Sequence, residues 1–462
     1  MNQTTESPLE IPNIRPFIAF RIFFNTRFYY PVFTILFLDF GLSLEQFALL
    51  NVAWAITIVL LEVPSGALAD VIGRRNLLIF AGVIMAIEIA LISFAPMGNI
   101  PLLFAIFLIN RILSGAAEAA ASGADEALAY DSLMQYGDIN KWGIVLEKEM
   151  RYKSIAFVVA MSLGAAVYDP DFMNRFLHWM GLDINLSQNI TLRFPLYLTL
   201  GTAVLALLST LQMKELPRDD ALVCIDYETC RKSVVQAFKL TIQAGKWIMS
   251  TPLALIIILS AMIFDHIIRM IVTLDSQYFR LINLPEAMFG LIGSVFSVLG
   301  IFIPRIALKF AENRTSTFNL GLTCIITLIG IFGMALFLPI FGLLPTLFLF
   351  SSFYLTGFYV SYYLNKIADS GQRATVLSFK GLSINGAYAL IGIFYSLLVG
   401  LQRSKLLDLQ PNLQGELLEN SVFVKSFMWF PWYFIVMMGL LLIFAQWTLR
   451  KSLSVSQKSK DE

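Results

Sequence analysis

The feature that most constrains this chain is a series of apolar segments, each about as long as a bilayer is thick. A helix needs roughly 20 apolar residues to cross the hydrocarbon core, and the 462-residue sequence supplies twelve such segments. They lie near residues 17–39, 45–65, 77–96, 101–122, 152–168, 194–212, 252–275, 287–310, 317–338, 344–365, 375–400 and 427–449. We therefore predict an all-α membrane protein with 12 transmembrane helices.

Composition agrees with a membrane protein and excludes several other classes. Hydrophobic residues make up 57% and charged residues 14% of the chain, against about 45–50% and about 25% in soluble domains. The formal net charge of +1 argues against a nucleic-acid partner. With three cysteines and two histidines, the chain offers neither a disulfide framework nor a usual metal-ligand set. We expect no metal and no cofactor.

Lysine and arginine are distributed unequally between the two sets of loops. The richer set carries Arg74, Arg75, Lys141, Lys148, Arg151, Lys153, Lys309, Arg314, Lys366 and Arg373. Because cytoplasmic loops are enriched in these residues, both termini are expected in the cytoplasm. The N-terminus lacks a signal peptide pattern, so the first span itself would direct insertion.

The longest predicted cytoplasmic break falls between six spans and six spans. It divides the chain into a bundle at 1–212, a linker at 213–251, a second bundle at 252–450 and a tail at 451–462. Within the linker, apolar residues from Val234 to Trp247 recur at helical spacing. This amphipathic stretch is expected either at the membrane surface or as a plain connector helix.

Between the second and third spans lies the run Gly66-Ala67-Leu68-Ala69-Asp70-Val71-Ile72-Gly73-Arg74-Arg75. Glycines allow sharp turns and close helix approach, and the acid can accept hydrogen bonds from helix-start amides or meet an arginine. The run resembles the signature loop of the major facilitator superfamily, G-x-L-A-D-R-x-G-R-R, with Val71 in place of the usual basic residue. Arg111-Ile112-Leu113-Ser114-Gly115 and Arg373-Ala374-Thr375-Val376-Leu377-Ser378 resemble segments of the family's fourth and eleventh helices.

The resemblance implies two pseudo-symmetric six-helix bundles with substrate bound between them near mid-membrane. It also implies that the loop residues Gly66, Asp70, Gly73, Arg74 and Arg75 form a gate that holds in one conformation and opens in the other. The matching loop of the second half is degenerate, and the family's antiporter motif is missing from the fifth span. That absence weakens an assignment to proton-driven drug export.

Ionisable residues inside the spans are the candidate functional residues, because such side chains normally face a wet cavity or a partner. In the fourth span Arg111, Gly115, Glu118, Ser122 and Asp125 share one helix face. This face is predicted to line the cavity, with Arg111 and Glu118 as substrate or proton ligands. The alternative is that both are tied structurally to neighbouring helices.

In the seventh span Asp265 and Arg269 are four residues apart and can neutralise each other. Asp265 is a candidate proton carrier and Arg269 a cavity residue, although a purely structural ion pair is an equal alternative. The neighbouring His266 could titrate near neutral pH, but polar packing is the favoured interpretation.

Three further spans contribute candidates. Arg27 lies near the centre of the first span, where its partner would be an anionic substrate group or an acid such as Asp265 or Glu118. Glu88 in the third span is interpreted as a structural partner, with proton coupling as the alternative. The remaining predicted cavity residues are Tyr354, Phe358, Asn365 and Asn385.

Taken together, the sequence predicts a secondary active transporter and not an enzyme. We expect proton-coupled efflux of a moderately hydrophobic compound by a monomer in a bacterial inner membrane. The alternative substrate is an anionic metabolite or a siderophore-like chelate, imported or exported. No phosphate-binding loop such as G-x-x-x-x-G-K-[ST] appears, so direct ATP drive is not expected. A membrane-embedded enzyme built on Asp265 and His266, and a transporter-shaped receptor, are the weaker classes.

Overall fold

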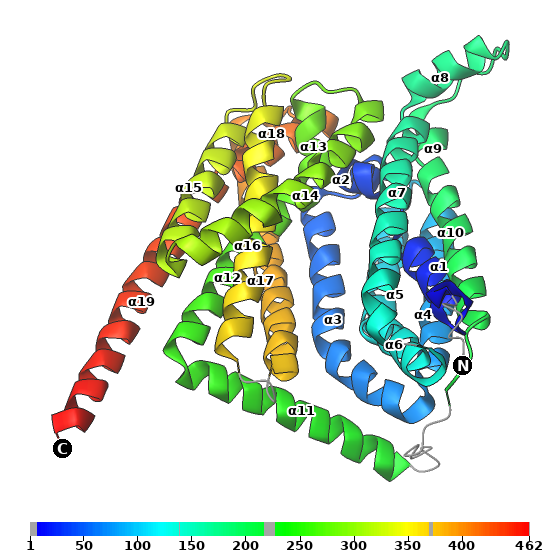
Figure 1. The fold of residues 1–462 in the computed structure, drawn as a ribbon. Coiled ribbons are helices and arrows are strands. Elements are labelled where there is room, and N and C mark those ends of the chain that lie inside the picture. The colour runs from blue at the N-terminus through cyan, green and yellow to red at the C-terminus, as the bar shows by residue number, and fades with distance from the viewer. Residues whose placement is uncertain (1–6, 138, 217–226, 369–372, 462) are drawn as a thin grey trace. The chain divides into compact units, whose positions relative to one another are not determined.

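The computed structural model describes residues 7–137, 139–216, 227–368 and 373–461 (Figure 1). Its secondary structure in these residues is helical. The α-helices of the first half are α1 (Ile14–Asn25), α2 (Phe33–Asp39), α3 (Leu44–Ile72), α4 (Arg74–Ser93), α5 (Ile100–Ala121), α6 (Ala124–Tyr136), α7 (Trp142–Tyr168), α8 (Pro170–Trp179), α9 (Gln188–Thr191) and α10 (Phe194–Leu211). Those that follow are α11 (Tyr227–Ser250), α12 (Pro252–Thr273), α13 (Asp275–Leu281), α14 (Phe289–Asn313), α15 (Ser316–Met334), α16 (Leu343–Ile367), α17 (Arg373–Leu409), α18 (Gly415–Phe427) and α19 (Phe430–Asp461).

The predicted all-α membrane fold is confirmed. Eleven helices in the described part of the chain are long and apolar enough to cross a membrane. The first predicted span, 17–39, is not one of them, because it is divided into α1, the short 3-10 helix η2 (Tyr30–Val32) and α2. The expectation of a continuous first helix was therefore wrong.

By its contacts the chain divides into two compact units, which are described separately here. The first consists of residues 1–42, 53–238 and 285–294, and the second of residues 43–52, 239–284 and 295–462. Compared with a division at the linker, Ser43 and the start of α3 up to Val52 belong to the second unit. The segment 285–294, which includes the start of α14, belongs to the first.

In the first unit α4 packs against α5 and α10, and α1 packs against α10 and α7. A small apolar core joins α1, α6 and α7 near their ends, around Ile14, Phe17, Leu133 and Val145. Because α1 has neighbours on several sides, its residues Phe17, Phe20 and Phe24 are buried.

In the second unit α12 packs against α16, α17 and α19, and α15 lies alongside α16 (Figure 1). Gly330 allows the last contact, since a Cβ there would lie 3.0 Å from the backbone nitrogen of Leu349. The core of this unit includes Ala261, Tyr359 and Val376. It brings α12, α16 and α17 together, and the cavity described below lies among them.

Helix α11 covers the stretch for which we predicted an amphipathic helix. Ala244 and Ile248 are buried in the core of the second unit, whereas Val235, Phe238 and Ile242 are exposed. Residues 217–226 of the predicted linker lie outside the described residues. An apolar exposed face fits the membrane-surface alternative, which stays a prediction.

Candidate functional site

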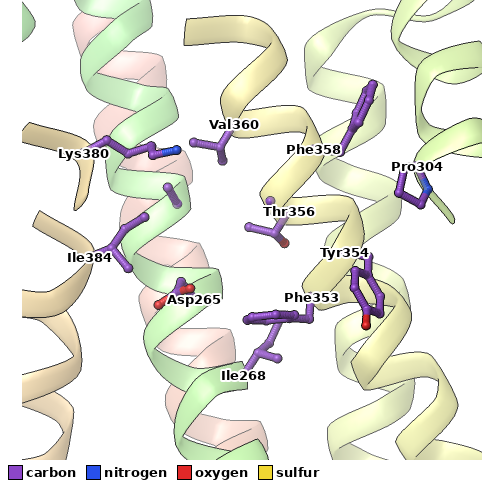
Figure 2. Close-up of a pocket in the computed structure, with 12 residues that line it drawn as sticks. Asp265, Ile268, Pro304, Phe353, Tyr354, Thr356, Phe358, Val360, Lys380 and Ile384 are labelled. Carbon is purple, nitrogen blue, oxygen red and sulfur yellow. The ribbon is translucent and has the colours of Figure 1, made fainter. Parts of the chain in front are cut away.

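The second unit contains a cavity of about 340 Å³ formed by α12, α14, α16 and α17. Figure 2 shows the residues that line it. Asp265, Tyr354, Thr356 and Lys380 supply its polar groups. The apolar lining residues are Ala261, Ile268, Pro304, Phe353, Phe358, Val360 and Ile384. This is the composition of a small-molecule site, in which a mainly apolar wall carries a few oriented polar groups.

Asp265 and Arg269 form the ion pair that their spacing on α12 predicts. The Arg269 Nη2 lies 2.7 Å from the Asp265 Oδ2, across one helical turn. The Arg269 Nη1 donates a hydrogen bond of 2.8 Å to the Asn385 Oδ1 on α17, and the guanidinium lies over the Tyr388 ring. The structure thus brings three of the predicted site residues together beside the cavity.

Lys380 on α17 is a lining residue that the sequence reasoning missed. Its Nζ donates to the Ser361 Oγ on α16 over 3.3 Å, and its charge interacts with the carboxylate of Asp265. The signal was present in the sequence, because Lys380 lies inside a predicted span, where an ionisable residue normally marks a function.

The predicted residues of α16 divide into two groups. Tyr354 and Phe358 line the cavity. Close packing fixes the Tyr354 ring, since a Cβ on Gly300 of α14 would lie 3.0 Å from it. Asn365 does not line the cavity, and its Nδ2 donates to the Ser361 carbonyl on its own helix over 2.9 Å.

His266 has a different environment from its neighbour Asp265. Its side chain is buried, its Nδ1 lies within hydrogen-bond reach of the Met262 carbonyl, and its Nε2 lies 3.1 Å from the Tyr433 hydroxyl. These contacts fit the favoured interpretation of polar packing, and His266 does not line the cavity.

In the first unit Arg27 is buried in a polar cluster with Glu88 of α4. The Arg27 Nη1 donates to the Glu88 Oε1 over 2.7 Å and to the Tyr29 hydroxyl over 3.0 Å. Asn110 of α5 donates to the carboxylate and to the carbonyl of Glu88. Only 2% of the Arg27 side chain and none of the Glu88 side chain is exposed. The ion-pair partner of Arg27 is Glu88, which the sequence analysis had not paired with it.

Arg27 lies in the interruption between α1 and η2, and neighbouring helices satisfy the backbone there. The Phe28 amide donates to the Thr199 Oγ1 over 3.0 Å, and the Thr202 Oγ1 donates to the Thr26 carbonyl over 2.9 Å. Gly164 of α7 lies directly against this segment, because a Cβ there would be 1.8 Å from the Phe28 oxygen. Non-helical backbone at membrane depth requires such substitute partners, and two threonines of α10 provide them.

The predicted polar face of the fourth span is only partly realised. Arg111 is buried between the rings of Phe33 and Trp54, each 5.3 Å from its guanidinium carbon, whereas Glu118 is exposed and interacts electrostatically with Arg27. The expectation that Asp125 lies on this helix was wrong, because α5 ends at Ala121 and Asp125 belongs to α6, which begins at Ala124. Gly123 makes the break with a φ of +76°.

At the predicted gating loop, the turn lies at Gly73 alone. Gly66 is inside α3, where a Cβ would meet nothing within 4 Å, so the expected sharp turn at this residue was wrong. Gly73 has a φ of +91° and precedes α4. The side chain of Asp70 lies outside the described part of the structure.

The two arginines of the loop are held by residues distant in the sequence. The Arg74 guanidinium forms an ion pair with Asp131 of α6, and the Arg75 Nε donates to the Met213 carbonyl over 2.6 Å. The carboxylate of Glu215 accepts the Arg74 amide over 3.1 Å and the Arg75 amide over 2.9 Å. Glu215 therefore caps α4 from the start of the linker, and the sequence analysis did not identify it.

Comparison with known proteins gives a family match over part of the chain. Residues 17–133 match the family model of the Major Facilitator Superfamily, the same part of the chain that carries the loop at 66–75. The N-terminal part of the chain is therefore similar to the major facilitator superfamily. No curated protein matches the chain.

Solved structures share the fold of this chain at low sequence identity. A bacterial homolog of the human lysosomal transporter Spinster superposes with a TM-score of 0.68 at 13% identity, covering 95% of this chain and 97% of the other. The nucleoside transporter NupG gives 0.67 at 12% identity, with 94% and 97% covered. A D-xylose-proton symporter gives 0.60 at 14% identity, with 90% and 96% covered.

Proposed function

We propose that this transporter works by alternating access and exports a moderately hydrophobic small molecule in exchange for protons. The observation that carries the proposal is the second-unit cavity, whose wall is mainly apolar and aromatic while Asp265 supplies a carboxylate. A compound of low polarity fits this wall. Structures with the same fold include a nucleoside transporter and a D-xylose-proton symporter, so transport of a small organic solute is within the range of the fold.

Asp265 is the proposed proton carrier. Its carboxylate is paired with Arg269 at 2.7 Å, and protonation would remove the charge that holds the pair. Arg269 would then be free to turn toward Asn385, with which it already shares a hydrogen bond. Transport would couple to protons because the paired and the protonated states favour different conformations.

The other candidates receive different parts in this proposal. Tyr354 and Phe358 contact the substrate body, and Asn385 positions Arg269. Glu118 is a second proton candidate because it is exposed. Arg27 and Glu88 compensate each other within the first unit, and we assign them to holding the interrupted first span and not to binding substrate or protons. Arg111 and Asn365 do not line the second-unit cavity, and we assign them no contact with the substrate there.

The proposed gate rests on the resemblance of the loop to the family signature, and the proposed orientation rests on the distribution of lysine and arginine between the loops. We propose that Asp70, Arg74 and Arg75 act in gating. Both termini would lie in the cytoplasm of a cell whose inner membrane holds the transporter as a monomer. Its partners would be the substrate, protons and the lipid bilayer.

A second candidate function is transport of an anionic metabolite or a siderophore-like chelate. The observation that favours it is Lys380, which lines the cavity together with Asp265. Asp265 is itself the ion-pair partner of Arg269. An anionic group would find a cation there without having to displace an existing ion pair.

The test is flux in liposomes that contain the purified protein, with labelled compounds and with or without an imposed pH gradient. The proposal expects accumulation that collapses with the gradient. Asp265→Asn should abolish gradient-driven flux but leave exchange of labelled for unlabelled compound largely intact. The control is Asp408→Asn, at an exposed carboxylate outside the cavity. Gradient-driven flux that persists in Asp265→Asn would remove Asp265 from the coupling step.

A further inference from the structure

We infer that Lys380 binds an anionic group of the transported compound, so that the substrate class is a ring-containing apolar molecule with one negative charge. The inference rests on the proposed function, since it assigns the second-unit cavity to the substrate. It narrows that function by naming the charge of the substrate and the residue that recognises it.

The balance of charge around the cavity is the first argument. Asp265 and Lys380 are its charged lining residues, and Arg269 lies next to Asp265 at 2.7 Å. One carboxylate therefore stands against two cations. Because the Asp265 carboxylate is paired with Arg269 and also interacts with Lys380, the three groups together keep one positive charge without a compensating anion in a mainly apolar environment.

The hydrogen-bonding capacity of Lys380 is the second argument. An ammonium group has three donors. Among the residues that the structure describes, Ser361 is its one hydrogen-bond partner, at 3.3 Å, and no carboxylate forms an ion pair with it. Figure 2 shows the side chain extending from α17 toward Val360 on α16, along the cavity wall. The remaining donors are available to an acceptor from a bound molecule.

The rest of the wall sets the body of the molecule. Phe353 and Phe358 present aromatic rings, and Ile268 and Ile384 present branched aliphatic groups. The cavity of about 340 Å³ is near the lower end of the range of about 300–1,000 Å³ for ligand pockets. A compound with one or two fused rings fits this volume. A cationic compound would meet two like charges and only an already paired carboxylate.

The test uses three probes that share one ring system and differ in charge, namely 2-naphthoate, 2-naphthamide and 2-naphthylmethylamine. Binding to the full-length protein in detergent is measured by titration calorimetry and by the shift of the unfolding midpoint. We expect the carboxylate to bind at least about tenfold more tightly than the amide, as for one charge-assisted hydrogen bond. The amine should bind most weakly.

Variants then assign this preference to a residue. Lys380→Gln should weaken 2-naphthoate binding about tenfold to hundredfold and leave 2-naphthamide unchanged, whereas Lys380→Arg should keep the preference. The control Lys366→Gln neutralises an exposed lysine of α16 outside the cavity. Equal affinity of wild type for carboxylate and amide, tighter binding of the amine, or no binding of any probe at millimolar concentration would overturn the inference. The first comparison needs no variant, so it holds even if Lys380→Gln fails to fold.

Failure of the inference is distinguishable from failure of the proposed function. A carboxylate preference that depends on Lys380, together with flux insensitive to the pH gradient, would refute proton coupling alone. Gradient-driven flux of neutral compounds without any carboxylate preference would refute the inference alone.

Discussion

The guanidinium of Arg27 lies 2.7 Å from the carboxylate of Glu88, and both side chains are almost completely buried inside the first unit. Burial makes this pair expensive to break, because removing one partner leaves an uncompensated charge. The relationship also explains why a charged residue is tolerated at the centre of the first span.

We predict that Glu88→Gln or Arg27→Gln alone lowers the free energy of unfolding by about 3–5 kcal/mol. The double variant should be more stable than either single variant, since it leaves no unpaired charge. Unfolding in detergent, followed by circular dichroism, measures the three values. A double variant less stable than both single variants would show that the pair is not the source of the loss.

The contact between α7 and the interrupted segment yields a steric prediction. Gly164→Ala would place a Cβ 1.8 Å from the Phe28 oxygen, so the helices must separate, at a cost of about 1–3 kcal/mol. Gly201→Ala on α10 is the matched control, because its Cβ would meet nothing within 4 Å. The yield of folded protein and its unfolding midpoint should fall for the first variant only.

The hydroxyl of Thr199 can be tested separately from its bulk. Thr199→Val keeps the shape but leaves the Phe28 amide without its acceptor at 3.0 Å, which should cost about 1–3 kcal/mol of stability. Ser154→Ala is the control, since this exposed hydroxyl donates only to a carbonyl of its own helix. Equal midpoints for Thr199→Val and wild type would mean that another group satisfies the amide.

Glu215 yields a prediction about the linker. Glu215→Gln removes the charge that caps the Arg74 and Arg75 amides, and loss of a cap costs about 0.5–2 kcal/mol. We expect the unfolding midpoint to fall and protease cleavage of the linker to quicken. Glu312→Gln, at an exposed carboxylate in the last turn of α14, should change neither. Unchanged cleavage in Glu215→Gln would show that the cap does not hold the linker.

The gating proposal predicts a kinetic effect without a binding effect. Asp70→Asn should slow the rate of substrate exchange across liposomes several-fold while the substrate concentration at half-maximal rate stays within about twofold. A gate controls the interconversion of states and not the affinity of either state. An altered affinity with an unaltered maximal rate would place Asp70 among the substrate ligands.

The fold and part of the site were predictable because their signals are local. Long apolar runs specify the spanning helices, and the spacing of Asp265 and Arg269 specifies their ion pair. The pairing of Arg27 with Glu88 could not be predicted, because 61 residues separate them and only tertiary packing brings them together. Glu215 is even farther away in the sequence, since 140 residues separate it from Arg75, whose backbone amide donates a hydrogen bond to its carboxylate.

The interruption of the first span was missed for a different reason. The residues around Phe24 include no glycine, and Pro31 follows only after the helix has already ended. Sequence patterns detect breaks through glycine and proline, whereas here the stabilising groups lie on α10. The sequence pattern therefore did not predict the interruption of the first span.

The threonine contacts of this interruption have a mechanical consequence. The backbone between α1 and α2 is hydrogen-bonded to threonines of α10 and not to a continuous helix of its own. Either helix can therefore tilt at this segment without breaking the hydrogen bonds of a helical turn. Such a tilt would change only the two threonine hydrogen bonds, which is a far smaller rearrangement than kinking a continuous membrane helix.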